Sequence, residues 1–166
     1  MRDIANICFM LKKVFFNSSI IFIVFFLDRL SKVTILSLTN PLGELNISFL
    51  SFINLQLVWN DGIAFGLLSM QNKLYYNLIT ILIGLITLII IWLGFKSKGL
   101  EKICFLIIAG GSLGNMFDRI FYSAVPDFID ISINNFHWFI FNVADIFIST
   151  GVILLIILEI FFKRKI

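Results

Sequence analysis

The sequence predicts an all-α membrane protein with four transmembrane helices and a small β-containing outer segment. Three observations support this fold class. Hydrophobic residues make up 60% of the chain and charged residues only 14%, whereas a soluble domain carries about 25% charged residues. The mean hydropathy is +1.03. Four apolar stretches reach the ~20 residues that a helix needs to cross a bilayer, and 166 residues leave room for a single domain, 1–166.

The four apolar stretches differ in the charges that they carry. The expected spans cover residues 14–36, 74–95, 103–120 and 139–162. The first contains Asp28, Arg29 and Lys32, and the fourth contains Asp145 near its start. The first stretch resembles a secretory signal peptide, but Asp28 and Arg29 interrupt it and no small-residue cleavage site follows. We therefore expect this span to be retained.

Basic residues set the expected orientation. An even number of spans places both termini on one side, and most basic residues flank that same face: Arg2, Lys12, Lys13, Lys96, Lys98, Lys102, Lys163, Arg164 and Lys165. Because cytoplasmic loops are enriched in Lys and Arg, both termini are expected in the cytoplasm. The net charge of +3 is then a topology signal and does not indicate nucleic-acid binding.

Two segments are expected outside the membrane on the opposite face. In residues 37–73, partial alternation from Asn46 to Val58 predicts short strands, and residues 60–62 form a turn signal. The apolar stretch from Ile63 to Met70 is expected to lie at the membrane surface. Residues 121–138 are expected to form a second outer loop.

Polar side chains from several elements are expected at one height near the outer interface. They are Asp28, Asn115, Arg119, Asp127, Asn142 and Asp145. Charged groups inside a membrane are costly and usually mark function. Each pair at helical spacing could simply neutralise itself or cap a helix end. Convergence of several such groups from three helices favours a shared site.

The candidate chemistry is a pair of carboxylates. His137 is the only histidine, which excludes an HExxH zinc site, and no GxSxG elbow exists. A Ser–His dyad remains an alternative, although we expect His137 at the membrane interface. Two acids close together in a low-dielectric site share one proton, so one can act as a base and the other as an acid.

Asp127 and Asp145 suit this carboxylate pair best. Asp130 is an alternative partner, and Asp61 and Asp118 are interpreted as turn and helix-end residues. Gly110 and Gly114 have the small-xxx-small spacing that allows close helix contact.

Five short blocks resemble the lipoprotein signal peptidase (signal peptidase II) family in order and spacing. They are Asp28-Arg29-Leu30-Ser31-Lys32, Asn60-Asp61-Gly62-Ile63-Ala64-Phe65-Gly66, Gly110-Gly111-Ser112-Leu113-Gly114-Asn115-Met116-Phe117-Asp118-Arg119, Val125-Pro126-Asp127-Phe128-Ile129 and Phe141-Asn142-Val143-Ala144-Asp145. One such block is weak, but five in order across nearly the whole chain are very specific.

The resemblance implies an aspartic endopeptidase that needs no metal or cofactor. It makes Asp127 and Asp145 the catalytic dyad, with Asn115, Arg119 and Asn142 lining the site. Asp28 and Lys32 would support the site, and Asn60 and Gly62 would belong to a substrate-holding segment. The family removes the signal peptide from diacylglyceryl-modified prolipoproteins, just before the lipidated Cys. The implied partners are lipidated prolipoproteins and membrane lipids, without nucleic acid or an obligate protein partner. The implied location is the bacterial cytoplasmic (inner) membrane, with the active site near the outer leaflet.

The chain departs from the family pattern at three positions. Pro126 replaces a more usual aliphatic residue, Ile63 replaces a common Ala, and Ile146 replaces a small hydroxyl residue. Ile146 is expected to crowd the pocket beside Asp145.

Two other functions remain open from the sequence. One is a small proton-coupled transporter in which Asp28 and Asp145 relay protons, and the other is a structural membrane subunit. The separation of the Asp127 and Asp145 carboxyl groups distinguishes them from the peptidase.

Overall fold

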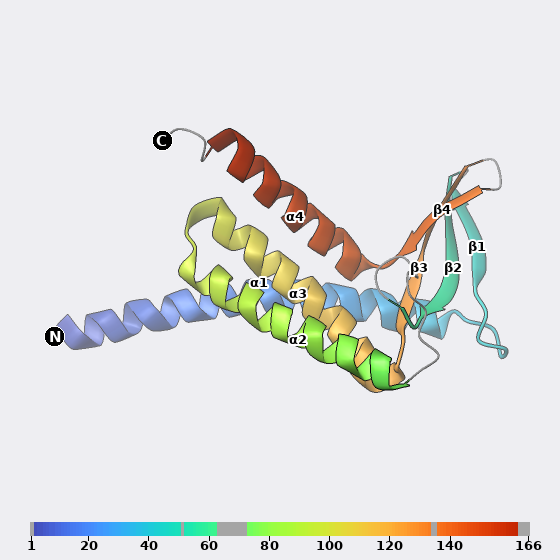
Figure 1. Ribbon diagram of the computed structural model, residues 1–166, viewed down its shortest axis with the longest axis horizontal. Coiled ribbons are helices and arrows are strands. Elements are labelled where there is room, and N and C mark those ends of the chain that lie inside the picture. The colour runs from blue at the N-terminus through green and yellow to red at the C-terminus, as the bar shows by residue number, and fades with distance from the viewer. Residues whose placement is uncertain (1, 51, 63–72, 134–135, 163–166) are drawn as a thin grey trace.

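The computed structural model describes residues 2–50, 52–62, 73–133 and 136–162, and these form a helix bundle with a small sheet at one end (Figure 1). The helices are α1 (Arg2–Ser37), α2 (Lys73–Lys96), α3 (Gly99–Tyr122) and α4 (Val143–Phe162). The strands are β1 (Asn46–Leu50), β2 (Ile53–Asn60), β3 (Val125–Ile133) and β4 (Phe136–Phe141). All four described helices are long and apolar enough to span a membrane. The expected fold class is confirmed.

Helix α3 is the central element of the bundle and packs against α1, α2 and α4. Its glycines allow the close approach that the spacing predicts. A Cβ added to Gly110 would lie 2.7 Å from Val24 Cβ of α1, and one added to Gly111 would lie 2.7 Å from the Ala144 carbonyl oxygen of α4. Small residues therefore bring α1 and α4 onto α3, where lipid tails give no hydrophobic driving force.

The sheet is antiparallel in the order β1-β2-β3-β4. Strands β1 and β2 confirm the short strands that the alternation between Asn46 and Val58 predicts. The segment 121–138 is not a simple loop, because it contains β3 and the first half of β4. Val58 pairs with Asp127 and Asn60 with Val125, so the end of β2 lies directly beside the candidate site.

The predicted start of the fourth span at residue 139 is wrong. Residues Phe136–Phe141 form β4, and α4 begins at Val143. The strand is almost entirely apolar, so its sequence resembles the helix that follows. Asp145 therefore lies in the first turn of α4 rather than ~9 Å along it, the depth that the rise per residue gives from residue 139.

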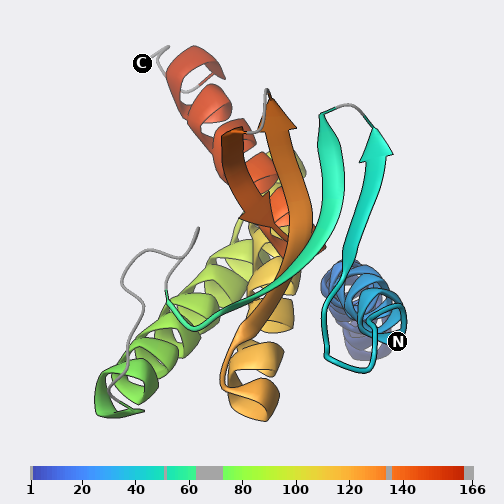
Figure 2. The same ribbon diagram turned by 90° about the vertical axis from the view of Figure 1, so that its right-hand side faces the viewer.

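A small apolar cluster fixes the sheet to the C-terminal end of α1. Ile35 of α1, Leu45 and Phe128 of β3 form its buried part. Figure 2 shows the sheet facing the viewer, with α1 beside β1 and with β4 leading toward α4. This packing holds β3 against the start of α4, which is where the candidate residues meet. The stretch from Ile63 to Met70 lies outside the described residues.

Candidate active site

Asp127 is a buried carboxyl group near the start of β3. Its exposed fraction is 3%. Its Oδ2 accepts a hydrogen bond from Asn60 Nδ2 at 2.9 Å, and its Oδ1 accepts one from Asn142 Nδ2 at 2.6 Å. Burial raises the pKa of Asp127 to about 6, the hydrogen bond from Asn60 opposes this rise, and the charge of Asp145 adds to it. Asp127 is thus placed to exchange a proton near neutral pH.

Asp145 is held by the N-terminal cap of α4. Asn142 Oδ1 accepts a hydrogen bond from the Asp145 backbone N–H at 3.1 Å, and Asp145 Oδ2 accepts one from the Asn142 backbone N–H at 3.2 Å. This reciprocal pattern is a capping box. Asp145 Oδ1 also accepts a hydrogen bond from Asn115 Nδ2 at 2.8 Å. The carboxyl group is therefore fixed by backbone structure as well as by a side chain of α3.

The two aspartates face one cavity and share one neighbour. Asn142 contacts both, and each of their carboxyl oxygens accepts one hydrogen bond. The cavity has a volume of about 180 Å³, and we call it the dyad cavity. It is lined by Asn60, Ile83, Ser112, Asn115, Arg119, Val125, Asp127, Asn142, Asp145 and Ile148. The structure thus brings together the two acids that the sequence selected.

A buried charge cluster lies behind the dyad cavity. Lys32 Nζ donates to Asp28 at 3.0 Å, to Asn115 Oδ1 at 2.8 Å and to Asp118 Oδ2 at 2.7 Å. Arg29 lies 2.6 Å from the second oxygen of Asp118. The cluster holds two cations and two carboxylates, and Lys32, Asp28 and Asp118 are fully buried. Through Asn115 it connects to Asp145.

Two parts of this cluster refine the sequence interpretation. Asp118, interpreted as a helix-end residue, is an ion-pair partner of Lys32 and Arg29. Asp28 does more than neutralise Lys32, because its Oδ1 accepts a hydrogen bond from the Ala144 N–H at 3.0 Å. Asp28 thereby satisfies a free donor in the first turn of α4 and helps to place Asp145.

Asn60 and Arg119 line the dyad cavity, and Gly62 contacts both of them. The Gly62 N–H donates to Asn60 Oδ1 at 2.9 Å, which closes a tight turn after β2. Arg119 Nη2 donates to the Gly62 carbonyl oxygen. Arg119 Nη1 is buried and has no hydrogen-bond partner among the described residues. Through its hydrogen bonds, Gly62 links Arg119 to Asn60, and both of these residues line the cavity.

Asp130 lies away from the dyad cavity. It is fully buried in the sheet, where its Oδ2 is 2.7 Å from His137 Nδ1. Neither residue lines the cavity that Asp127 and Asp145 share. Ser132 accepts a hydrogen bond from Asn54 at 2.7 Å. Asp130 is thus a partner for His137 and not for the other aspartates.

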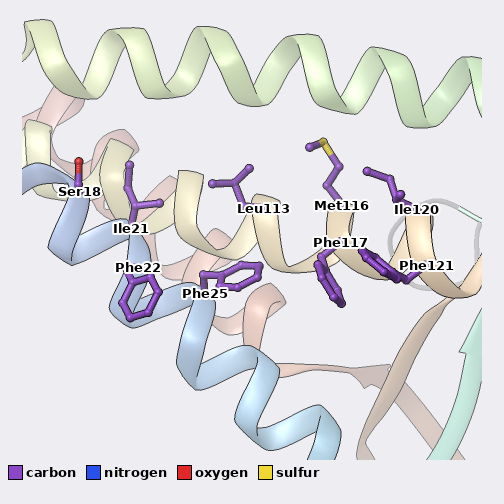
Figure 3. A pocket seen from close by; sticks show the side chains of 9 residues that line it. All are labelled: Ser18, Ile21, Phe22, Phe25, Leu113, Met116, Phe117, Ile120 and Phe121. Carbon is purple, nitrogen blue, oxygen red and sulfur yellow. The ribbon is translucent and has the colours of Figure 1, made fainter.

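Two apolar grooves lie on the helices. The α1–α3 groove, shown in Figure 3, has a volume of about 520 Å³ and is lined by Ser18, Ile21, Phe22, Phe25, Leu113, Met116, Phe117, Ile120 and Phe121. The α4 groove has a volume of about 400 Å³ and is lined by Phe139, Phe141, Asp145, Ile146, Ser149, Thr150 and Ile153.

Ile146 lines the α4 groove and is absent from the dyad cavity. The expectation that Ile146 crowds the dyad is therefore wrong. Pro126 is tolerated because β4 pairs with β3 only from Ile129 onward, so one side of β3 has no neighbouring strand at Pro126.

Sequence reasoning missed two kinds of site residue. Ser112, Ile83 and Ile148 line the dyad cavity, but nothing in their spacing distinguishes them from ordinary core residues. Asp118 carried a usable signal, because it is an acid at the end of a predicted span, one helical turn beyond Asn115.

Comparisons with known proteins agree with this geometry. A model of the family described as signal peptidase (SPase) II matches residues 20–162. The chain is 50% identical over 155 residues to a lipoprotein signal peptidase of Pelagibacter ubique (strain HTCC1062), covering 93% of each protein. It is 41% identical over 124 residues to a lipoprotein signal peptidase of Francisella tularensis subsp. novicida (strain U112), covering 72% of this chain and 77% of that one.

Solved structures also match the whole fold. A bacterial membrane enzyme determined by the in meso method at 2.3 Å superimposes with a TM-score of 0.73 at 28% sequence identity. The match covers 90% of this chain and 91% of the other. A second such structure at 1.9 Å gives a TM-score of 0.68 at 27% identity.

Proposed function

Because the chain belongs to the signal peptidase II family, we propose that Asp127 and Asp145 form the catalytic pair with which this membrane peptidase removes signal peptides from lipoprotein precursors. The observation that carries the proposal is Asn142, which contacts both carboxyl groups at one cavity. The alternatives of a transporter or a structural subunit are set aside, since the family and the relatives are peptidases.

The pair works with one shared proton. Two carboxylates beside one small cavity do not both ionise easily, so one stays protonated while the other is a base. The base takes a proton from a water molecule, whose oxygen attacks the scissile carbonyl carbon. The protonated acid donates to the carbonyl oxygen, and the former base, now protonated, gives the proton that it took from water to the amine nitrogen as the C–N bond breaks. The pair titrates as a unit, so the proton belongs to both residues.

The surrounding amides orient the two acids. Asn60 and Asn142 donate to Asp127, and Asn115 donates to Asp145. These donors fix the carboxyl planes, which is the positioning that catalysis requires. At about 30 Å³ per water molecule, the dyad cavity has room for roughly six waters or for one peptide bond with its attacking water.

Arg119 is the proposed anchor for the substrate. Arg119 lines the dyad cavity, and a guanidinium group can donate to a backbone carbonyl or a lipid oxygen. Gly62, held by Arg119 Nη2, and Asn60 lie at the same edge. We assign this edge to the segment that holds the substrate.

The proposed orientation places the sheet and dyad on the outer side of the cytoplasmic membrane. In Figure 1, α1 begins and α4 ends on the side opposite the sheet, and α2 and α3 are joined on that same side. The basic residues of the sequence gather at these ends. Positive residues favour the cytoplasm, so both termini are cytoplasmic in this proposal.

The proposed substrate is a diacylglyceryl-modified prolipoprotein that reaches the dyad through the membrane. Its signal-peptide helix arrives with its backbone hydrogen bonds made, whereas a soluble extended peptide would bring unpaired groups into the apolar layer. The test incubates purified protein with lipidated prolipoprotein and measures product masses. Two products are expected, from cleavage of the peptide bond just before the lipidated Cys. An uncleaved substrate, or cleavage elsewhere, would contradict the proposal.

A further inference from the structure

The α4 groove meets the dyad cavity at Asp145, the one residue that the linings of both share. We propose that this groove holds one acyl chain of the substrate lipid and thereby determines which chain lengths are processed efficiently. This inference rests on the proposed function of Asp127 and Asp145. It assigns the groove to hydrocarbon and not to the signal-peptide helix.

The groove lies on the face of α4 that points away from α3. Cβ atoms added to Gly111 and Gly151 show which face meets α3, because the first would contact Ala144 and Ile148 and the second Ile108. The groove residues Ile146, Ser149, Thr150 and Ile153 have the spacing i, i+3, i+4 and i+7, which places them on one other face.

The groove extends from the dyad toward the middle of the bilayer. Ile146 and Ile153 are 43% and 56% exposed, so their side chains face the surroundings of the bundle. From Asp145 to Ile153 the helix rises about 12 Å at 1.5 Å per residue. An acyl chain joined to the residue beside the scissile bond would begin next to Asp145 and run along this face.

The volume and the polarity of the α4 groove indicate which kind of molecule it holds. A helix of 20 residues is about 10 Å wide and 30 Å long and so fills roughly 2,400 Å³, far more than the groove of about 400 Å³. An extended peptide would bring backbone N–H and C=O groups against a lining in which only Asp145, Ser149 and Thr150 have polar side chains. The Ser149 hydroxyl offers them no donor, because it already donates to the Asp145 carbonyl oxygen. A hydrocarbon chain has no such groups.

The α4 groove positions the substrate and adds little to its binding affinity. Lipid tails are as apolar as the groove, so transfer of the chain from the bilayer releases little free energy. A seated chain instead restrains the scissile bond relative to Asp145. The larger α1–α3 groove shares no lining residue with the dyad cavity, so a chain seated there would not provide this restraint.

The test blocks the far end of the α4 groove. Ile153→Trp and wild type are compared on two prolipoproteins that carry diacylglyceryl groups with palmitoyl or with butyryl chains. We expect kcat for the palmitoyl substrate to fall about tenfold, because a misplacement of about 1 Å can cost about 100-fold. The butyryl substrate is too short to reach Ile153 and should be cleaved at the wild-type rate.

Leu113→Trp in the α1–α3 groove is the matched control, and it should leave the ratio of the two rates unchanged. Equal losses on both substrates in Ile153→Trp, or no loss on either, would overturn the inference. The same chain-length effect in Leu113→Trp would overturn it as well. Failure of wild type to cleave either substrate would instead refute the proposed function.

Crosslinking gives a readout that does not depend on turnover or on the folding of the tryptophan variant. The palmitoyl substrate carries a photoreactive group at the acyl end and is bound to Asp127→Asn, which is expected to hold it uncleaved. Adducts within residues 146–153 of α4 support the inference. Adducts confined to α1 or α3 refute it.

Discussion

Asn142 donates a hydrogen bond from Nδ2 to Oδ1 of Asp127 over 2.6 Å, and the same side chain caps α4 through Oδ1. One residue therefore joins the strand that carries the first aspartate to the helix that carries the second. Mutation can separate these two roles of Asn142. A serine hydroxyl can replace the Oδ1 acceptor that caps α4, but it is too short to donate to Asp127 as the Asn142 amide does.

Asn142→Ser and Asn142→Ala separate these roles. We expect both to lower kcat by about 100-fold, because Asp127 loses the donor that orients it. Ser preserves a capping oxygen, so Asn142→Ala should be less stable than Asn142→Ser by about 1 kcal/mol. Thermal unfolding in detergent and product formation are measured together. Full activity of Asn142→Ser would show that the bond to Asp127 is dispensable.

Asn60 controls the ionisation of Asp127. Its side-chain N–H stabilises the carboxylate, so Asn60→Ala should raise the pKa of Asp127 above the value of about 6 that burial gives it in the native protein. A limb of the pH–kcat profile, which reports the coupled pair, should then move to higher pH, whether Asp127 is the acid or the base. Asn54→Ala is the control, since Asn54 lies in the same strand but contacts Ser132. A limb that stays in place or moves to lower pH would contradict this assignment.

Lys32 stabilises the fold from within the bundle. Lys32→Met leaves one buried carboxylate uncompensated and should lower the free energy of unfolding by about 3–5 kcal/mol. Adding Asp118→Asn restores charge balance and should recover part of that loss. The exposed Lys98 is the control, and Lys98→Met should change stability by less than about 0.5 kcal/mol. If Lys32→Met is as stable as wild type, the charge cluster does not support the site.

The fork of Arg119 is expected to bind substrate. Arg119→Lys keeps the charge but loses the bidentate geometry that reaches both Gly62 and the dyad cavity. We expect kcat/KM to fall at least about tenfold, the loss of one charge-assisted hydrogen bond of about 1.5 kcal/mol or more. Steady-state kinetics on the lipidated substrate measure this. Unchanged kcat/KM would make Arg119 an interfacial anchor whose end reaches the headgroups.

Much of this architecture is predictable because membrane physics acts on single segments. Apolar length predicts the four helices, and the shared-proton chemistry of two close carboxylates favours Asp127 and Asp145 as a pair. Strand β4 was not predictable, because Phe136–Phe141 has almost no polar residue and an apolar run does not distinguish a strand from a helix.

The errors at Asp118 and Ile146 have a related cause. The partner of Asp118 lies 86 residues away on another helix, so only packing reveals it. Ile146 follows Asp145 by one position, which turns its side chain about 100° around the helix, so it lines the α4 groove and not the dyad cavity. Long-range contacts and element boundaries, rather than residue chemistry, limited the prediction.

The central claim, that Asp127 and Asp145 act as one catalytic unit, is tested most directly by the cleavage rates of Asp127→Asn, Asp145→Asn and the double variant. The substrate is a lipidated prolipoprotein, and circular dichroism in detergent verifies the fold of each variant. Each single change is expected to abolish cleavage, and the double variant should be little worse than either, because residues that act as a unit lose activity non-additively. Near-normal turnover by either folded single variant would contradict the claim.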